Sequence, residues 1–231
     1  MKIGVADSGI GGLNLLAKLI RERCGDEYIY LADGANLPYG NKTPERLRTI
    51  ALDNAERLIK EGANVIVFGC NTLSVTALDY VRKRIAPPLF GLRPRPELLS
   101  GKALLMTTPT TALFLPKIEA NVSLLTPASL ASLIDADYPS FERVTPYLSP
   151  LLLPYDDVET VFLGCSHFPF AKEVIQDLLP RAKITDGTAS LARLIRAVLP
   201  PCGQKSPSVR FLFTGEREGE RYGRILSQLL Q

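Results

Sequence analysis

Short apolar runs and amphipathic stretches alternate along this chain. Runs rich in β-branched, aromatic and other apolar residues predict short buried strands at 3–6, 28–32, 65–68, 89–92, 103–107, 122–125, 160–163 and 209–213. Between several of them, apolar residues recur every three or four positions, as at Leu13, Leu16, Ala17 and Ile20, which predicts amphipathic helices. Strands that alternate with helices are typical of an α/β protein with parallel sheets.

Helix ends carry signals of their own. Thr43 followed by Pro44 predicts an N-cap and a first helical residue, and Gly62 predicts the end of that helix. Further helices are expected around Val75 to Ile85, and at 128–134, 169–179, 191–198 and 222–230. The segment 138–157 combines many prolines with weak periodicity, so no element is predicted there.

The proline-rich stretch 87–96 predicts a crossover between two lobes, because each proline lacks an N–H donor and disfavours helix in the residue before it. We expect residues 1–92 together with 187–231 to form a first α/β lobe. Residues 93–186 then form a second, shortened lobe. The expected fold class is therefore two pseudo-symmetric, doubly wound α/β lobes with mainly parallel sheets and a site in the cleft between them.

Two segments nearly repeat one another: 65–72, ending Gly-Cys-Asn-Thr, and 160–167, ending Gly-Cys-Ser-His. Each predicts a buried strand that delivers one cysteine, Cys70 or Cys165, where parallel sheets bind ligands. A strand-end cysteine taken alone is more often a small apolar residue of the core. If the segments are equivalent, however, two thiols face each other across one cleft, an arrangement that suits proton transfer on opposite sides of one carbon. His167, the only histidine, lies close enough to Cys165 to share its proton.

Two turns are candidate binding elements. The turn 7–12, Asp-Ser-Gly-Ile-Gly-Gly, follows the first strand and opens the first helix, so its backbone N–H groups could receive an anion. It does not match the dinucleotide fingerprint, and Asp7 would repel a phosphate; a capped strand-to-helix turn is the alternative. The turn Pro38-Tyr39-Gly40 could place a phenol and backbone amides over the same cleft.

Composition narrows the range of partners. The 231 residues are 46% hydrophobic and 22% charged, with a net charge of +3, too small and too dispersed to favour nucleic acid or a membrane surface. No apolar run reaches the length of a membrane span, and the N-terminus leads directly into a strand, so we expect a cytoplasmic protein. The four cysteines are far apart in sequence, which disfavours a disulfide framework; Cys24 and Cys202 are assigned to packing or surface.

Five motifs together resemble those of glutamate racemases, within the aspartate/glutamate racemase superfamily. In chain order they are 7–12, 38–40, 70–72, the threonine-rich 107–111 and 164–169. The resemblance implies a cofactor-independent, metal-free isomerase that interconverts L- and D-glutamate for peptidoglycan synthesis, and thereby serves cell-wall biogenesis and cell shape. It also implies a homodimer. Cys70 and Cys165 would be the two bases, assisted by Asp7 and His167 respectively. The implied substrate contacts are Asp7, Ser8, Pro38, Tyr39, Gly40, Asn71, Thr72, Thr108, Thr111, Ser166 and His167.

The chain also departs from that pattern. Ser166 and Phe168 stand where the family usually has Thr and Tyr, the second lobe is shortened, and Arg93 and Arg95 add positive charge to the crossover, where one could pair with a substrate carboxylate. The alternatives that remain open are an aspartate or other amino-acid racemase, a one-cysteine decarboxylase or isomerase, a zinc site built on the Cys, His and Asp side chains, and a catalytically impaired binding or regulatory paralogue.

Overall fold

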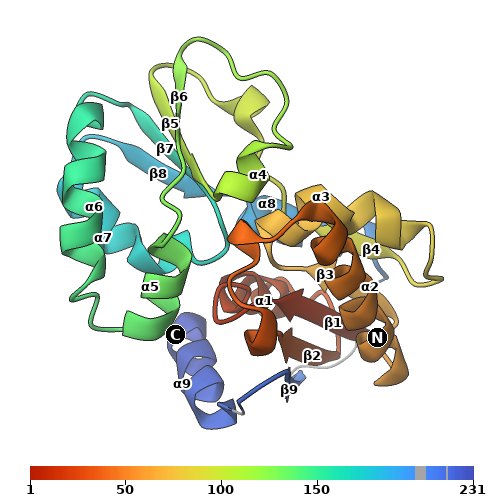
Figure 1. Ribbon diagram of the computed structural model, residues 1–231. Coiled ribbons are helices and arrows are strands. Elements are labelled where there is room, and N and C mark those ends of the chain that lie inside the picture. The colour runs from red at the N-terminus through yellow and green to blue at the C-terminus, as the bar shows by residue number, and fades with distance from the viewer. Residues whose placement is uncertain (201–206, 217) are drawn as a thin grey trace.

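The computed structural model describes residues 1–200, 207–216 and 218–231, which form two parallel β-sheets (Figure 1). In the first sheet the strand order is β4-β3-β1-β2-β9. Its strands are β1 (Lys2–Asp7), β2 (Glu27–Ala32), β3 (Val65–Phe68), β4 (Leu89–Gly91) and β9 (Ser208–Phe213). The second sheet has the order β6-β5-β7-β8 and consists of β5 (Ala103–Thr107), β6 (Val122–Leu125), β7 (Thr160–Gly164) and β8 (Lys183–Asp186). We call each sheet with the helices packed on it a lobe.

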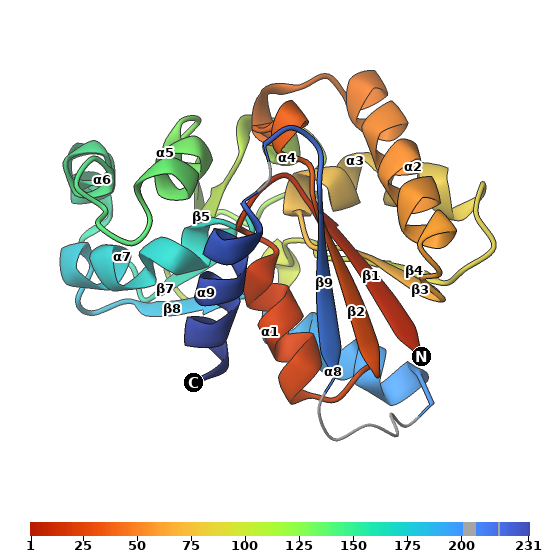
Figure 2. The ribbon, with the colours of Figure 1, turned by 90° about the horizontal axis from the view of Figure 1, so that it is seen from below.

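Helices connect and cover these strands. They are α1 (Leu13–Arg21), α2 (Pro44–Lys60), α3 (Asn71–Arg82), α4 (Pro109–Ala112), α5 (Leu130–Asp137), α6 (Val144–Leu152), α7 (Lys172–Leu178), α8 (Thr188–Val198) and α9 (Gly219–Leu230). Figure 2 shows α1 and α9 on one side of the first sheet and α2 with α3 on the other. Helix α1 packs against both α8 and α9, and α2 packs against α3. The predicted fold class, α/β lobes with parallel sheets, is confirmed.

The two-residue period of the strands divides the core between the two faces of the first sheet. In β3, Val65 and Val67 pack into the cluster beneath α1, whereas Ile66 and Phe68 pack into the cluster beneath α2 and α3. Burial on both faces explains why this strand is a continuous apolar run. At the start of α2, the Thr43 side chain accepts a hydrogen bond from the Arg46 N–H at 3.3 Å, so the predicted cap is confirmed.

Both lobes reverse their strand order at the same point. The first lobe proceeds from β1 to β2 on one side and continues with β3 and β4 on the other; the second repeats this with β5 to β6 and then β7 to β8. The switch points, between β1 and β3 and between β5 and β7, are where such sheets open a crevice at their carboxyl ends. Cys70 follows β3 and Cys165 follows β7, so each lobe delivers one thiol at its switch point.

Some elements differ from the sequence-based expectations. Strand β8 was not predicted, because it has only four residues, which are partly or largely exposed and form no apolar run. Helix α6 occupies part of the segment for which no element was predicted, and it contains Pro150. The helix expected to extend to Ile85 ends at Arg82.

The lobe boundaries after residues 92 and 186 stay a prediction, although β4 ends at Gly91 and α8, which packs on α1, begins at Thr188. Cys24 is buried and its thiol contacts the Ala192 carbonyl, whereas Cys202 lies outside the described residues. None of the helices in the described ranges combines the length and the apolar composition that a membrane span requires.

Candidate active site

The Cys70 thiol lies at the N-terminus of α3, directly after the buried strand β3, and the residue is 4% exposed. Burial, the Asp7 carboxylate and the Cys165 sulfur together hold its pKa well above the usual value for a thiol. The backbone N–H groups of Thr72 and Leu73 oppose this effect only in part. Cys70 is therefore a protonated thiol at rest, within electrostatic reach of Cys165 from the other lobe.

Asp7 ends β1, next to the strand that delivers Cys70. Its carboxylate is fully buried, and Oδ1 accepts a hydrogen bond from the Gly9 N–H at 3.2 Å. Burial raises the pKa of this carboxyl, although the positive charge of His167 and the Gly9 bond act in the opposite direction. A buried carboxyl with a raised pKa beside a thiol is a candidate group for proton transfer at a functional site.

His167 contacts Cys165 on one side and a carboxylate from another helix on the other. Its Nε2 lies 2.8 Å from Asp135 Oδ2, and both side chains are almost completely buried. Burial alone would lower the pKa of His167, but hydrogen bonds to Asp135 and Cys165, together with the charges of Asp135 and Asp7, raise it well above its usual value. The imidazole is therefore held as a cation next to the Cys165 sulfur.

Asp135 was not among the residues predicted from the sequence. It lies on α5, and its Oδ2 also accepts a hydrogen bond from the Ile10 N–H at 2.9 Å, which links the second lobe to the turn after β1. Arg221 of α9 lies 3.6 Å from Asp135 Oδ1. Burial would raise the pKa of Asp135, but His167, the Ile10 N–H and Arg221 lower it. The signal that was available is that Asp135 directly follows the apolar pair Leu133 and Ile134 in a mainly apolar helix, where Asp137 is the other acidic residue.

A close approach of backbone to side chain brings the first turn to the second cysteine. At Gly11, a Cβ would lie 2.5 Å from His167 Nδ1 and 2.6 Å from Ser166 Oγ. Only glycine leaves room for these side chains. The predicted turn 7–12 of the first lobe therefore lies directly against the Cys165–Ser166–His167 segment of the second.

Three threonine hydroxyls from the two lobes form a hydrogen-bonded triangle. Thr72 Oγ1 lies 2.9 Å from Thr108 Oγ1 and 3.0 Å from Thr111 Oγ1, and the Thr108 hydroxyl donates to Thr111 at 2.8 Å. All three residues are buried. The predicted substrate contacts on α3 and α4 are thus brought together, in a cluster that can turn its hydroxyls toward a carboxylate.

Several buried polar atoms at this site have no hydrogen-bond partner among the described residues. They include Asp7 Oδ2, Asn71 Oδ1 and Ser166 Oγ. An orphaned buried oxygen is costly, so such atoms normally find a partner in water or a ligand. Ser8 and Asp135 line a cavity of about 400 Å³, whose lining includes neither cysteine and none of these three orphaned atoms.

The Tyr39 hydroxyl is bonded within the first lobe, although Tyr39 shares a buried cluster with Cys70. It donates to Asp33 Oδ2 at 2.6 Å and accepts from Asn54 Nδ2 at 3.0 Å, inside the first lobe. The phenol is therefore fully engaged as a structural group. The turn Pro38-Tyr39-Gly40 packs closely against the second lobe, because a Cβ at Gly40 would lie 2.9 Å from the Thr108 Cβ.

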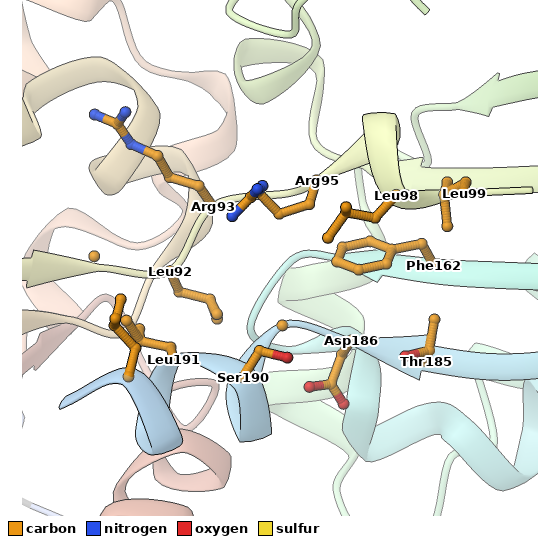
Figure 3. A pocket seen from close by; sticks show the side chains of 13 residues that line it. Leu92, Arg93, Arg95, Leu98, Leu99, Phe162, Thr185, Asp186, Ser190 and Leu191 are labelled. Atoms are coloured by element: carbon orange, nitrogen blue, oxygen red, sulfur yellow. The ribbon is translucent and has the colours of Figure 1, made fainter. Parts of the chain in front are cut away.

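The crossover arginines lie at a different cavity. Arg93 and Arg95 line a space of about 500 Å³ between the lobes, whose lining includes neither cysteine. They pair with Asp79 and Glu97 respectively. Figure 3 shows the Arg93 side chain extending away from Phe162 and from the other labelled side chains that line this cavity. Each guanidinium group thus pairs with one carboxylate of this chain, and Arg93 Nε has no hydrogen-bond partner among the described residues.

The zinc alternative depends on a cluster of ligands. Within the part of the chain that the structure describes, no group of three or more His, Cys, Asp or Glu side chains is arranged to hold a metal ion.

Comparison with known proteins gives one consistent result. The chain is 34% identical over 224 residues to a curated glutamate racemase of Clostridium perfringens, covering 89% of this chain and 86% of that protein. The glutamate racemase of Campylobacter jejuni superposes with a TM-score of 0.84 at 20% identity, over 100% of this chain and 98% of that one, which shows a shared fold. The Francisella tularensis glutamate racemase in complex with D-glutamate has a TM-score of 0.80 at 26% identity, over 100% and 93% of the chains. No family model matches the sequence.

Proposed function

Because this chain belongs to the glutamate racemase family, we propose that it interconverts L- and D-glutamate by moving the α-proton between two cysteines. The observation that supports this most directly is the meeting of two buried thiols from two lobes, each at the switch point of its sheet and each with its own ionisable partner. A mechanism with one nucleophile, or a metal-dependent one, would need only one of the two thiols.

The surroundings of the two thiols differ before reaction. The raised pKa of Cys70 keeps it protonated, ready to donate, while Cys165 lies beside the His167 cation. In one direction, the Cys165 thiolate takes the α-proton, and the C–H electron pair remains on the α-carbon. The Cys70 thiol then delivers its proton to the opposite face, which leaves Cys70 as thiolate and Cys165 as thiol. The reverse direction exchanges these roles, so atoms and charge balance without a cofactor.

The carbanion needs stabilisation by groups already in place. We propose that the orphaned oxygens and backbone of Asp7, Ser8, Asn71 and Ser166 bind the ammonium and α-carboxylate, with the acidic oxygens reserved for the ammonium. The hydroxyl triangle of Thr72, Thr108 and Thr111, with the backbone of Pro38, Tyr39 and Gly40, would hold the carboxylates from the other side. Donors fixed in a buried site cost little reorganisation during the reaction.

The wider role follows from the reaction. D-glutamate is a component of peptidoglycan, so we propose that the protein supplies cell-wall synthesis and thereby contributes to cell shape, as a cytoplasmic enzyme that needs only its amino-acid substrate. A homodimer is proposed on the same family basis.

The test follows the α-hydrogen. Purified protein is incubated with L- or D-glutamate in deuterated water, and both optical rotation and α-deuterium are measured. Racemisation with one solvent deuterium in each newly inverted product is expected. Racemisation of aspartate alone would change the substrate assigned, and binding of glutamate with no exchange of its α-hydrogen would contradict the enzyme and indicate a binding paralogue.

A further inference from the structure

A fourth threonine on the second lobe lies apart from the hydroxyl triangle and contacts the first lobe. The Thr110 hydroxyl donates to the Gly40 carbonyl at 2.7 Å and lies 3.3 Å from the Lys42 carbonyl. Thr110 is 6% exposed, so this bond is buried. Figure 1 shows its helix, α4, beside α3 and close to the segment that follows β2.

The other side of the same turn is anchored firmly within the first lobe. Asp33 is buried and accepts hydrogen bonds from the Tyr39 hydroxyl and from Asn36 Nδ2, while Asn54 donates to the Tyr39 hydroxyl. The turn is therefore bonded to the first lobe, and the Thr110 hydroxyl is a direct link from it to α4.

The link lies where two proposed binding elements meet. Thr108 and Thr111, on either side of Thr110, take part in the hydroxyl triangle, and the backbone at Gly40 packs directly against Thr108. The Thr110 hydroxyl points in another direction, to the turn itself. Helix α4 and its N-cap residue thus place two hydroxyls in the triangle and a third on the carbonyl of the opposing turn.

We propose that Thr110 is a positioning residue, which fastens the second lobe to the Tyr39–Gly40 turn so that both binding elements face the substrate together. This inference rests on the proposed function, because it assumes that the turn and the triangle contact the same amino acid. Without the bond, a smaller fraction of molecules has the two elements in place, and the apparent affinity falls by that fraction.

The test compares three variants in the full chain. Thr110→Val keeps the shape of the side chain but removes its O–H, and Thr110→Ser restores a hydroxyl. Thr76→Val is the matched control, because the buried Thr76 hydroxyl also donates to a backbone carbonyl, that of Thr72, but within a single helix. Steady-state kinetics, hydrogen exchange at residues 39–42 and thermal unfolding are measured for each.

For Thr110→Val we expect the KM for glutamate to rise about tenfold, equivalent to about 1.4 kcal/mol, with kcat changed less than twofold. Amide exchange at residues 39–42 is expected to accelerate by a similar factor, and Thr110→Ser to remain near the wild type. Thr76→Val is expected to unfold at lower temperature with KM and exchange at 39–42 unchanged.

Three results would overturn the proposal. The first is amide exchange at residues 39–42 that is as slow in Thr110→Val as in the wild type, and the second is a raised KM in Thr110→Val without faster exchange at these residues. The third is a rise in KM and in exchange at 39–42 in Thr76→Val that equals the rise in Thr110→Val. If the wild-type protein does not turn over glutamate, the proposed function fails on its own. The exchange measurement then still decides whether Thr110 holds the turn.

Discussion

Replacing Asp135 by asparagine tests the assignment of His167 as a cationic partner of Cys165. The amide keeps one acceptor oxygen for the Ile10 N–H and the imidazole, but it removes the negative charge and introduces NH₂ donors near Arg221. Burial then dominates the ionisation of His167, so we expect its pKa to fall and its positive charge to be lost at neutral pH.

The magnitude follows from the bond that is weakened. A hydrogen bond between ionised partners contributes roughly 1.5–3 kcal/mol, and about 1.36 kcal/mol corresponds to a factor of ten in rate. We therefore expect kcat/KM for Asp135→Asn to fall roughly 10- to 150-fold. Because the enantiomers have equal free energies in water, their equilibrium constant is one, and kcat/KM must fall equally in both directions.

The assay is a pH profile of kcat/KM by circular dichroism, with α-deuterium exchange measured from each enantiomer. In the wild type, the raised pKa keeps His167 charged until the pH rises through that raised value. In the variant this charge is lost at lower pH, so the ratio of wild-type to variant activity is expected to grow as the pH rises into the neutral range. Exchange should differ between enantiomers, because His167 contacts only Cys165.

Asp137→Asn is the matched control on the same helix, since Asp137 pairs with Arg143 and not with the site. It should retain wild-type kinetics. If Asp135→Asn keeps wild-type activity and pH dependence, or if Asp137→Asn loses as much, the argued role of the His167–Asp135 pair is refuted.

Three further outcomes are expected. Cys70→Ser and Cys165→Ser should each lower racemisation by roughly 10²- to 10⁴-fold. Each variant should retain α-deuterium exchange mainly from one enantiomer, and the retained enantiomer should differ between the two variants. Identical exchange patterns would contradict the two-base scheme. Burial raises the pKa of Asp7, so its ionisation opposes folding as the pH rises through that value. Asp7→Asn should therefore increase the free energy of unfolding at neutral pH by roughly 0.5–2 kcal/mol while lowering activity, and urea titrations should show the gain disappearing in acid. Arg221→Gln should lower kcat/KM about two- to fivefold, as expected for a partly exposed pair, whereas Arg224→Gln, which alters a more exposed pair, should not.

The fold was largely predictable because its central strands are buried on both faces and therefore stand out as apolar runs. The same runs, each ending in Gly-Cys, indicated Cys70 and Cys165. Strand β8 has no such run, since its residues are partly or largely exposed. Helix α6 was hidden by proline: Pro146 lies in the first turn, where a missing N–H costs little, but Pro150 lies inside the helix.

The parts of the site that sequence could not supply are those set by contacts between distant segments. Asp135 reaches His167 across 32 positions, from a helix whose sequence carries no motif. The direction of the Tyr39 phenol depends on Asp33 and Asn54, which only the folded first lobe brings beside it. The local sequence pattern identifies the backbone segments that end at a site. The direction of a polar side chain depends instead on the hydrogen-bond partners that tertiary packing places beside it.

The place of β9 at the edge of the first sheet has a consequence for how the chain is made. Its residues pair Ser208–Phe213 with Glu27–Ala32, so β2 lacks its outer neighbour until residues 208–213 have left the ribosome. Strands β5 to β8 can pair among themselves well before that moment. The nascent protein therefore has a paired second sheet while the apolar strand β2 still has an unpaired edge. Chaperones bind such exposed edges, and a chain that exposes one without a chaperone is prone to aggregate.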